Sequence, residues 1–201
     1  MVQISIILGI VASFAQITGY FIYSRKINIG RIKPNTASWS IWASGAILES
    51  SSYVFITGDW VKNLLPIVCA LSALILFLHC LFRGHFSKLT RLEWFLVATY
   101  FLAIFVWWYQ SVFYAHLLLV FTAIIAYLPI ISDVWSDPMV EDATPWYIWT
   151  VAYSLFTLLV ILRWEKWIDI VYPLVSVFLS IIVAILAMDR RIPRTIRFKN
   201  A

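Results

Sequence analysis

Apolar residues fill seven stretches of this sequence, and short polar connections separate them. The stretches span approximately residues 3–23, 36–57, 62–82, 93–111, 114–132, 146–163 and 168–188. Each has about the 20 residues that an α-helix needs to cross the hydrocarbon core of a bilayer. The pattern therefore predicts an all-α integral membrane protein with seven transmembrane helices, in a single membrane domain that covers residues 1–201.

The composition supports this prediction and narrows the class of protein. Of the 201 residues, 63% are hydrophobic and only 12% are charged, which is far more apolar than a soluble domain of this size. The net charge of +5 does not indicate a nucleic-acid partner, because the basic residues lie at the ends of the apolar stretches. Basic residues in those places orient a membrane protein in its bilayer.

The basic residues are divided unequally between the two sides of the predicted membrane. With seven spanning helices, one side carries 12 of the 15 lysines and arginines, and the other carries Lys62, Arg163 and Lys166. Because basic residues collect on the cytoplasmic side, we predict an outside N-terminus and a cytoplasmic C-terminus, in a bacterial cytoplasmic (inner) membrane. The basic tail, residues 191–201, is expected to contact anionic lipid.

An internal repeat divides the sequence into two units, at an offset of 107 residues. The matched pairs are Tyr20 and Tyr127, Trp39 and Trp146, Trp42 and Trp149, Trp60 and Trp167, and Pro66 and Pro173. Such self-similarity is typical of duplication, although aromatic residues also gather at both membrane surfaces independently. We interpret residues 1–84 and 112–190 as two repeats of three helices each, residues 85–111 as a linker helix, and 191–201 as the tail. Because one helix links them, both repeats enter the membrane in parallel.

This arrangement of three, one and three helices resembles the SWEET and PQ-loop superfamily of membrane transporters. The Pro-Gln dipeptide of that superfamily, near the end of the first helix of each repeat, is largely missing here. The second repeat has Tyr127-Leu128-Pro129-Ile130, and the first has Tyr20-Phe21-Ile22-Tyr23. The resemblance implies a transporter that works by alternating access between its two units, with a hinge at Pro129.

Glu49 is the most unusual residue of the apolar stretches, because a carboxylate within a membrane segment is costly and is by default a functional candidate. Helical spacing places it on a polar and aromatic stripe, made of Trp42, Gly45, Ala46, Glu49, Ser52 and Tyr53. The equivalent stripe of the second repeat is Trp149, Ala152, Tyr153, Phe156 and Val160. We predict that both stripes line a substrate cavity, in which Glu49 binds a proton or the substrate. The alternative is a protonated, hydrogen-bonded glutamic acid that fixes helix packing.

Two further polar residues lie within the apolar stretches. Gln16 is expected either to bind substrate or to bridge helices, and His116 to contact the cavity or to relay protons with Glu49. The alternative for both is a purely structural role.

The remaining aromatic residues, prolines and cysteines receive structural interpretations. Trp39 and Trp146 are assigned to the interfacial aromatic belt. Pro66 and Pro173 are expected in the first turns of their helices, where proline loses no hydrogen bond. The two cysteines are interpreted as small packing residues.

Two loops predicted on the cytoplasmic side carry opposite charges at equivalent positions of the repeat. Residues 25–35 contain Arg25, Lys26, Arg31 and Lys33. Residues 132–142 contain Asp133, Asp137, Glu141 and Asp142. We predict that the loops pair and form an inner latch; the alternative is two independent, solvated loops, because exposed ion pairs stabilise little.

No sequence motif of an enzyme or metal site is present. We therefore predict a non-enzymatic transporter or facilitator of a small polar or aromatic metabolite, without metal or cofactor, that is compatible with a homo-oligomer. The alternative is a non-transporting receptor, scaffold or assembly factor. A central cavity around Glu49 favours transport, whereas a bundle packed solidly around this residue favours the scaffold.

Overall fold

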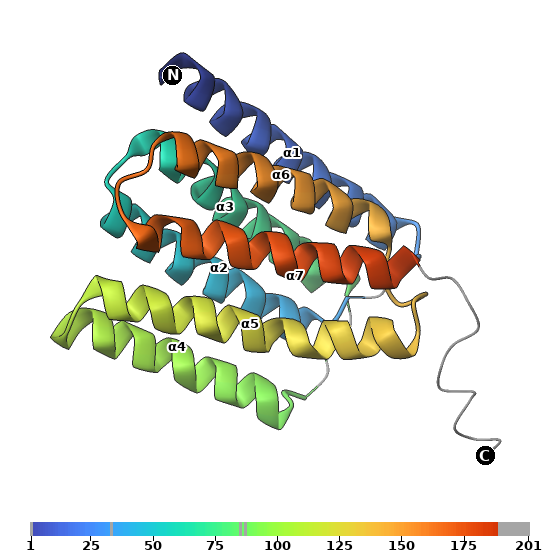
Figure 1. Cartoon of the computed structure of the whole chain (residues 1–201). Coiled ribbons are helices and arrows are strands. Elements are labelled where there is room, and N and C mark those ends of the chain that lie inside the picture. The colour runs from blue at the N-terminus through green and yellow to red at the C-terminus, as the bar shows by residue number, and fades with distance from the viewer. Residues whose placement is uncertain (1, 33, 85, 87, 189–201) are drawn as a thin grey trace.

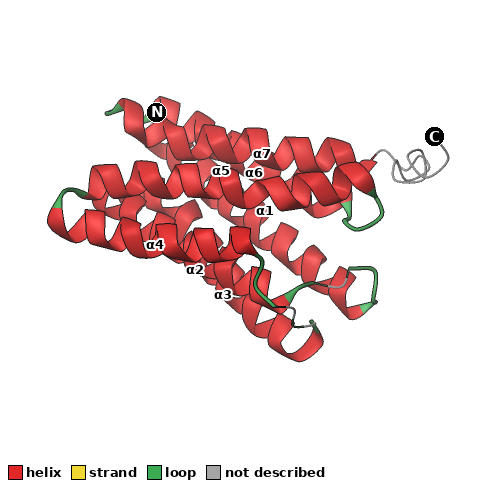
Figure 2. Cartoon of the chain, turned by 90° about the horizontal axis from the view of Figure 1, so that it is seen from below, coloured by secondary structure: helices red, strands yellow, loops and turns green. Residues whose placement is uncertain are grey.

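The computed structural model describes residues 2–32, 34–84, 86 and 88–188. Within these residues the chain is entirely helical, with short connections (Figure 2). The helices are α1 (Val2–Asn28), α2 (Thr36–Thr57), α3 (Trp60–Arg83), α4 (Arg91–Tyr109), α5 (Val112–Ser136), α6 (Ala143–Leu162), a short 3-10 helix η1 (Trp167–Ile170) and α7 (Val171–Met188). Each predicted apolar stretch corresponds to one α-helix. The tail predicted to contact lipid, residues 191–201, lies outside the described residues.

Polar residues in the connections determine where the helices begin. The side chains of Asp59, Ser111 and Asp142 each accept a hydrogen bond from a backbone N–H of the helix that follows. Thr90 and Glu93 form a reciprocal capping box at the start of α4. Such caps satisfy backbone donors that the first helical turn leaves without a partner. The helix boundaries thus follow from short-range sequence.

The predictions for Pro66, Pro129 and Pro173 have different outcomes. Pro173 lies in the first turn of α7, as predicted, directly after η1. Pro66 does not lie in a first turn, because α3 already begins at Trp60. The cap at Asp59 starts this helix earlier than the apolar pattern indicated. Pro129 lies inside α5, as expected, and its role as a hinge stays a prediction.

The helices alternate in direction along the chain and run roughly side by side (Figure 1). One end of the molecule carries the α1–α2, α3–α4 and α5–α6 connections; we call it the α1–α2 end. The opposite end, the α2–α3 end, carries the α2–α3, α4–α5 and α6–α7 connections. Helices α1, α3, α2, α5, α7 and α6 pack in this order, and α6 returns to α1, so that six helices close a ring. Helix α4 packs outside this ring, against α5 and α2.

The packing follows the repeat found in the sequence. Helix α1 packs against α3 and α6, and its equivalent α5 packs against α7 and α2. Individual contacts follow the same offset: the Tyr20 and Trp149 rings lie 4.9 Å apart, and those of their equivalents Tyr127 and Trp42 lie 4.8 Å apart. The two units therefore contact each other twice, through equivalent residues.

The outer surface and the lengths of the helices indicate a helical membrane protein. Six of the described helices, all except α2 among the seven α-helices, are long and apolar enough to cross a membrane. Large apolar side chains such as Phe14, Phe55, Ile75 and Phe82 are exposed on the ring, and a soluble protein rarely exposes so many. Helix α2 is more polar because it carries Glu49 and six serines.

Candidate functional site

A cavity of about 480 Å³ lies inside the helix ring. It is lined by residues from all seven α-helices and extends toward the α1–α2 end, where Asn35, Asp133, Val140 and Glu141 form part of its wall. This volume is in the range of small-molecule sites, about 300–1,000 Å³. The bundle is therefore not packed solidly around its polar residues.

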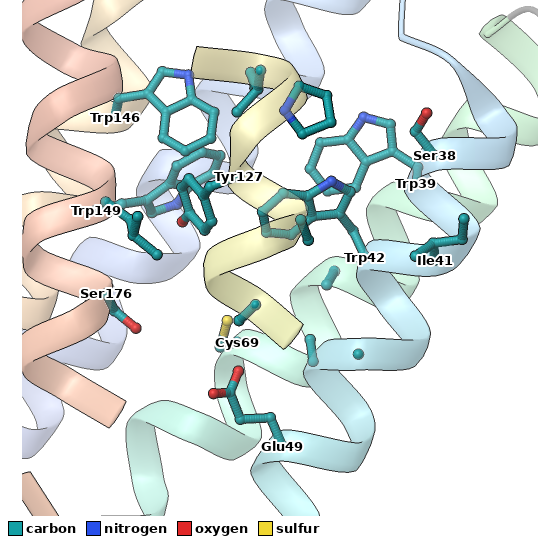
Figure 3. Close-up of a pocket in the computed structure, with 18 of the residues that line it drawn as sticks. Ser38, Trp39, Ile41, Trp42, Glu49, Cys69, Tyr127, Trp146, Trp149 and Ser176 are labelled. Atoms are coloured by element: carbon teal, nitrogen blue, oxygen red, sulfur yellow. The ribbon is translucent and has the colours of Figure 1, made fainter. Parts of the chain in front are cut away.

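Aromatic rings form the walls of the cavity. Trp42, Tyr127, Trp149 and Tyr20 line it as the two equivalent pairs described above. Trp149 also meets Trp146 edge to face, with ring centroids 4.9 Å apart. Figure 3 shows these tryptophans and Tyr127 gathered on one side of the cavity, away from Glu49. The rings from the two units thus face a common space.

A glycine allows one of these contacts. A Cβ atom at Gly19 would overlap the indole nitrogen of Trp149, so only glycine lets α1 approach this ring. The Trp149 Nε1 atom is buried and has no hydrogen-bond acceptor among the described residues. This nitrogen faces Gly19 of α1, which has no side chain that could accept a hydrogen bond, so the close packing of α1 against Trp149 leaves it without an acceptor.

Glu49 lies in the cavity as predicted, together with Trp42, Gly45 and Ala46 of its stripe. Its carboxylate points into the cavity (Figure 3). None of the described residues donates a hydrogen bond to this carboxylate or forms an ion pair with it. The alternative of a glutamic acid held by hydrogen bonds to neighbouring helices is therefore not what the structure contains.

Gln16, Tyr153, Tyr20 and Cys69 form a polar cluster in the wall. The Gln16 Nε2 atom lies 3.3 Å from Cys69 Sγ and 3.4 Å from the Tyr153 hydroxyl, and the Tyr20 hydroxyl lies 3.6 Å from the same sulfur. The Gln16 Oε1 atom is buried without a donor among the described residues. Gln16 therefore bridges α1, α3 and α6 and also lines the cavity, so both roles considered for it are compatible with its position.

The remaining candidates lie behind the cavity wall. His116 and Tyr53 are fully buried and are not part of the lining. The His116 Nδ1 atom lies 2.9 Å from the Ser52 hydroxyl, which in turn donates to the backbone oxygen of Glu49. Tyr53 donates to the backbone oxygen of Asp169, at 2.9 Å. His116 is thus linked through Ser52 to the backbone of Glu49, and not to the Glu49 carboxylate. Tyr53 packs behind the residues that line the cavity.

The aromatic belt assigned to Trp146 is wrong, because this residue is only 5% exposed and lines the cavity. Its indole donates to Glu141 at 3.1 Å. Trp39 is half-buried and also lines the cavity. The positions of Trp39 and Trp146 near the helix ends suggested the membrane–water interface, but tertiary packing turns both rings toward the cavity.

At the α1–α2 end, the two charged loops pair as predicted. Lys26 and Arg31 contact the carboxylate of Asp142 at 2.8 and 3.0 Å. Burial opposes the charge on Asp142, but the hydrogen bonds from Lys26 and Thr144 outweigh it and hold its pKa below the usual value. Lys33, another member of the basic cluster, lies outside the described residues. The function of this contact as a latch stays a prediction.

Glu141 connects the loop to the cavity. It accepts hydrogen bonds from the Tyr23 hydroxyl, at 3.0 Å, and from Trp146. Burial raises the pKa of Glu141 to about 7, although both hydrogen bonds favour its ionised form. This carboxylate therefore changes its charge near neutral pH.

The α2–α3 end is closed by a buried ion pair that the sequence analysis missed. Lys62 Nζ lies 2.7 Å from Asp169 Oδ2, and both side chains are 0% exposed. Arg163 forms an ion pair with Asp59 nearby. Burial opposes the charge on Asp59, but Arg163 and the backbone N–H of Val61 outweigh it and lower its pKa. Lys62 and Asp169 lie at equivalent positions, 107 residues apart, so opposite charges at one repeat position were a signal that could have identified the pair.

Neither a group of metal ligands nor a similar protein identifies the function of this site. Within the part of the chain that the structure describes, no group of three or more His, Cys, Asp or Glu side chains could hold a metal ion. No family model, no curated protein and no solved structure matches this sequence or its fold. The resemblance to the SWEET and PQ-loop superfamily therefore stays an inference from helix arrangement and repeat.

Proposed function

We propose that this protein is a small-molecule transporter or facilitator of the bacterial inner membrane, related to the SWEET and PQ-loop superfamily. In this proposal all seven α-helices cross the membrane, α1–α3 and α5–α7 are parallel repeats, and α4 links them. The α1–α2 end faces the cytoplasm, because it carries most basic residues. Substrate occupies the cavity, and rocking of the two units exposes it to each side in turn.

The observation that carries the proposal is the cavity between the two units, with the unpaired Glu49 carboxylate in its wall. A scaffold gains nothing from a cavity around an acid that is costly within a membrane segment. Alternating access requires a cavity that is open to one side of the membrane and closed to the other, and the two ends of the molecule differ in this way. The cavity extends to exposed residues at the α1–α2 end, whereas Lys62 and Asp169 close the other end.

Glu49 has two roles under this proposal, which one measurement separates. It either carries a proton during transport or binds a polar group of the substrate. In the first case Glu49→Gln removes the pH dependence of transport, and in the second it weakens substrate binding at every pH.

Cysteine accessibility tests the proposal without a known substrate. In a Cys69→Ala/Cys80→Ala background, Ser176→Cys places a thiol in the cavity wall. A membrane-impermeant methanethiosulfonate is added to one side of oriented vesicles at a time. We expect Ser176→Cys to react from both sides, because alternating access exposes the same cavity to each side.

Two exposed positions serve as matched controls for sidedness. Met139→Cys at the α1–α2 end should react only from the cytoplasmic side, and Lys166→Cys at the α2–α3 end only from outside. Reaction of Ser176→Cys from one side only, with both controls behaving as expected, contradicts alternating access and favours the receptor or scaffold. Exchange of the two control results contradicts the orientation.

A further inference from the structure

The charged side chains that line the cavity are all acidic. They are Glu49, Glu93, Asp133 and Glu141, and no described lysine, arginine or histidine contributes to the lining. Lys26 and Arg31, at the α1–α2 end, are paired with Asp142. Among the described residues, the charged side chains of the lining are therefore of one sign.

Two of its deeper polar groups are acceptors without donors. The carboxylate of Glu49 has no hydrogen-bond or ion-pair partner among the described residues. The Oε1 atom of Gln16, a residue that is 1% exposed, likewise has no donor. An acceptor that is withdrawn from bulk water without a donor is unfavourable, and more so when it is charged. Glu93 differs, because Ser38 and Thr90 donate to it.

The aromatic walls favour the same kind of ligand. The faces of tryptophan and tyrosine rings carry partial negative charge and attract cations within about 6 Å. Trp42, Tyr127, Trp149 and Tyr20 present such rings from both units. Lone acceptors, a free carboxylate and aromatic faces are all complementary to a positive group.

We propose that the cavity binds a small organic cation, whose ammonium or quaternary ammonium group lies between the tryptophan and tyrosine rings and the Glu49 carboxylate. An anion would meet four acidic side chains there, and a neutral sugar would not form an ion pair with Glu49. Movement of this cation across the membrane rests on the proposed transport function, but its binding does not.

The test measures binding of a matched pair of probes to purified protein in nanodiscs, by calorimetry or tryptophan fluorescence. Choline and 3,3-dimethylbutan-1-ol have nearly the same shape and differ by one positive charge. We expect choline to bind at least about tenfold more tightly than the alcohol, and tetramethylammonium to compete with it. Glu49→Gln should weaken choline binding at least about tenfold, equivalent to about 1.4 kcal/mol, and leave the alcohol unaffected.

Further variants distinguish a loss of choline binding at the cavity from a loss of folding. Trp42→Phe keeps an aromatic face and should retain choline binding, whereas Trp42→Leu should weaken it. Asp137→Asn removes a negative charge from the nearby loop without touching the cavity lining and should leave binding unchanged. Thermal unfolding of each variant identifies any that fail to fold. Glu49→Asp, which keeps the carboxylate, should retain choline binding, and Glu49→Ala replaces Glu49→Gln if the latter fails to fold.

The outcomes distinguish this inference from the proposed function. Equal binding of choline and the alcohol, no binding of choline or tetramethylammonium, or an unchanged affinity in Glu49→Gln overturns the cation site. If these results occur while Ser176→Cys reacts from both sides, transport stands and the cation is wrong. If choline binds as expected but Ser176→Cys reacts from one side only, the cation site stands and transport is wrong.

Discussion

Ion pairs lie at both ends of the helix ring, but the two sets differ in their exposure to water. At the α2–α3 end, Lys62 and Asp169 are fully buried and lie 2.7 Å apart. At the α1–α2 end, Asp142 is buried, but its partners Lys26 and Arg31 are 22% and 38% exposed. Water screens the second set and not the first.

This difference indicates which contact opens more easily. Breaking a buried pair leaves uncompensated charges in a medium of low polarity, whereas a partly exposed pair exchanges its partner for water at little cost. We therefore expect the contact at the α2–α3 end to resist opening more strongly than the contact at the α1–α2 end. Three predictions, in order of decreasing effect, test this contrast.

Lys62→Met should cause the largest loss of stability, about 3–5 kcal/mol, because it leaves Asp169 buried without a cation. The double variant Lys62→Met/Asp169→Leu should recover most of this loss, since two apolar side chains need no compensation. Denaturant unfolding of the detergent-solubilised protein measures both. Lys166→Met is the control at the same end, because Lys166 is exposed. A double variant as unstable as the single one would show that the pair is not what holds this end.

Glu141 should give a smaller effect that depends on pH. Burial raises its pKa from 4.5 to about 7, so the folded state holds a proton that the unfolded state has already released. Stability should consequently fall as the pH rises from about 4.5 to about 7, and then level off. Glu141→Gln should remove this decline in the free energy of unfolding. The exposed Glu165→Gln should keep it, and equal slopes in all three proteins would refute the prediction.

Asp142→Asn should cost the least, about 1 kcal/mol at low salt, because asparagine still caps α6 and only the attraction to Lys26 and Arg31 is lost. The loss should shrink as salt increases, since the partners are partly exposed. Asp137→Asn is the control, with the same change of charge in the same loop. A loss as large as that of Lys62→Met would show that the two ends are equally strong.

The sequence predicted the helices well and the cavity in part. Glu49, Trp42, Trp149, Tyr153 and Gln16 line the cavity as expected, whereas Ser52, Ala152, Phe156 and Val160 of the two stripes do not. Helical spacing places residues on a shared face but does not determine how much of that face meets the cavity. Trp146 was misjudged and His116 does not contact the cavity, since position along a helix gives depth in the membrane and not the direction in which a side chain packs. The proton relay between His116 and Glu49 stays a prediction. Tyr23 and Glu141 were missed as cavity residues because their roles arise from contacts between α1 and the α5–α6 loop.

The sequence by itself determined that this is a helical membrane protein with an internal repeat. Long apolar stretches must satisfy their backbone hydrogen bonds within their own helices in a bilayer, so their positions can be read directly. Only the tertiary structure decided how six of the helices close into a ring, which faces enclose the cavity, and that Lys62 meets Asp169 across the repeat. Those outcomes depend on packing between residues far apart in the sequence, which neither apolar patterning nor helical period specifies.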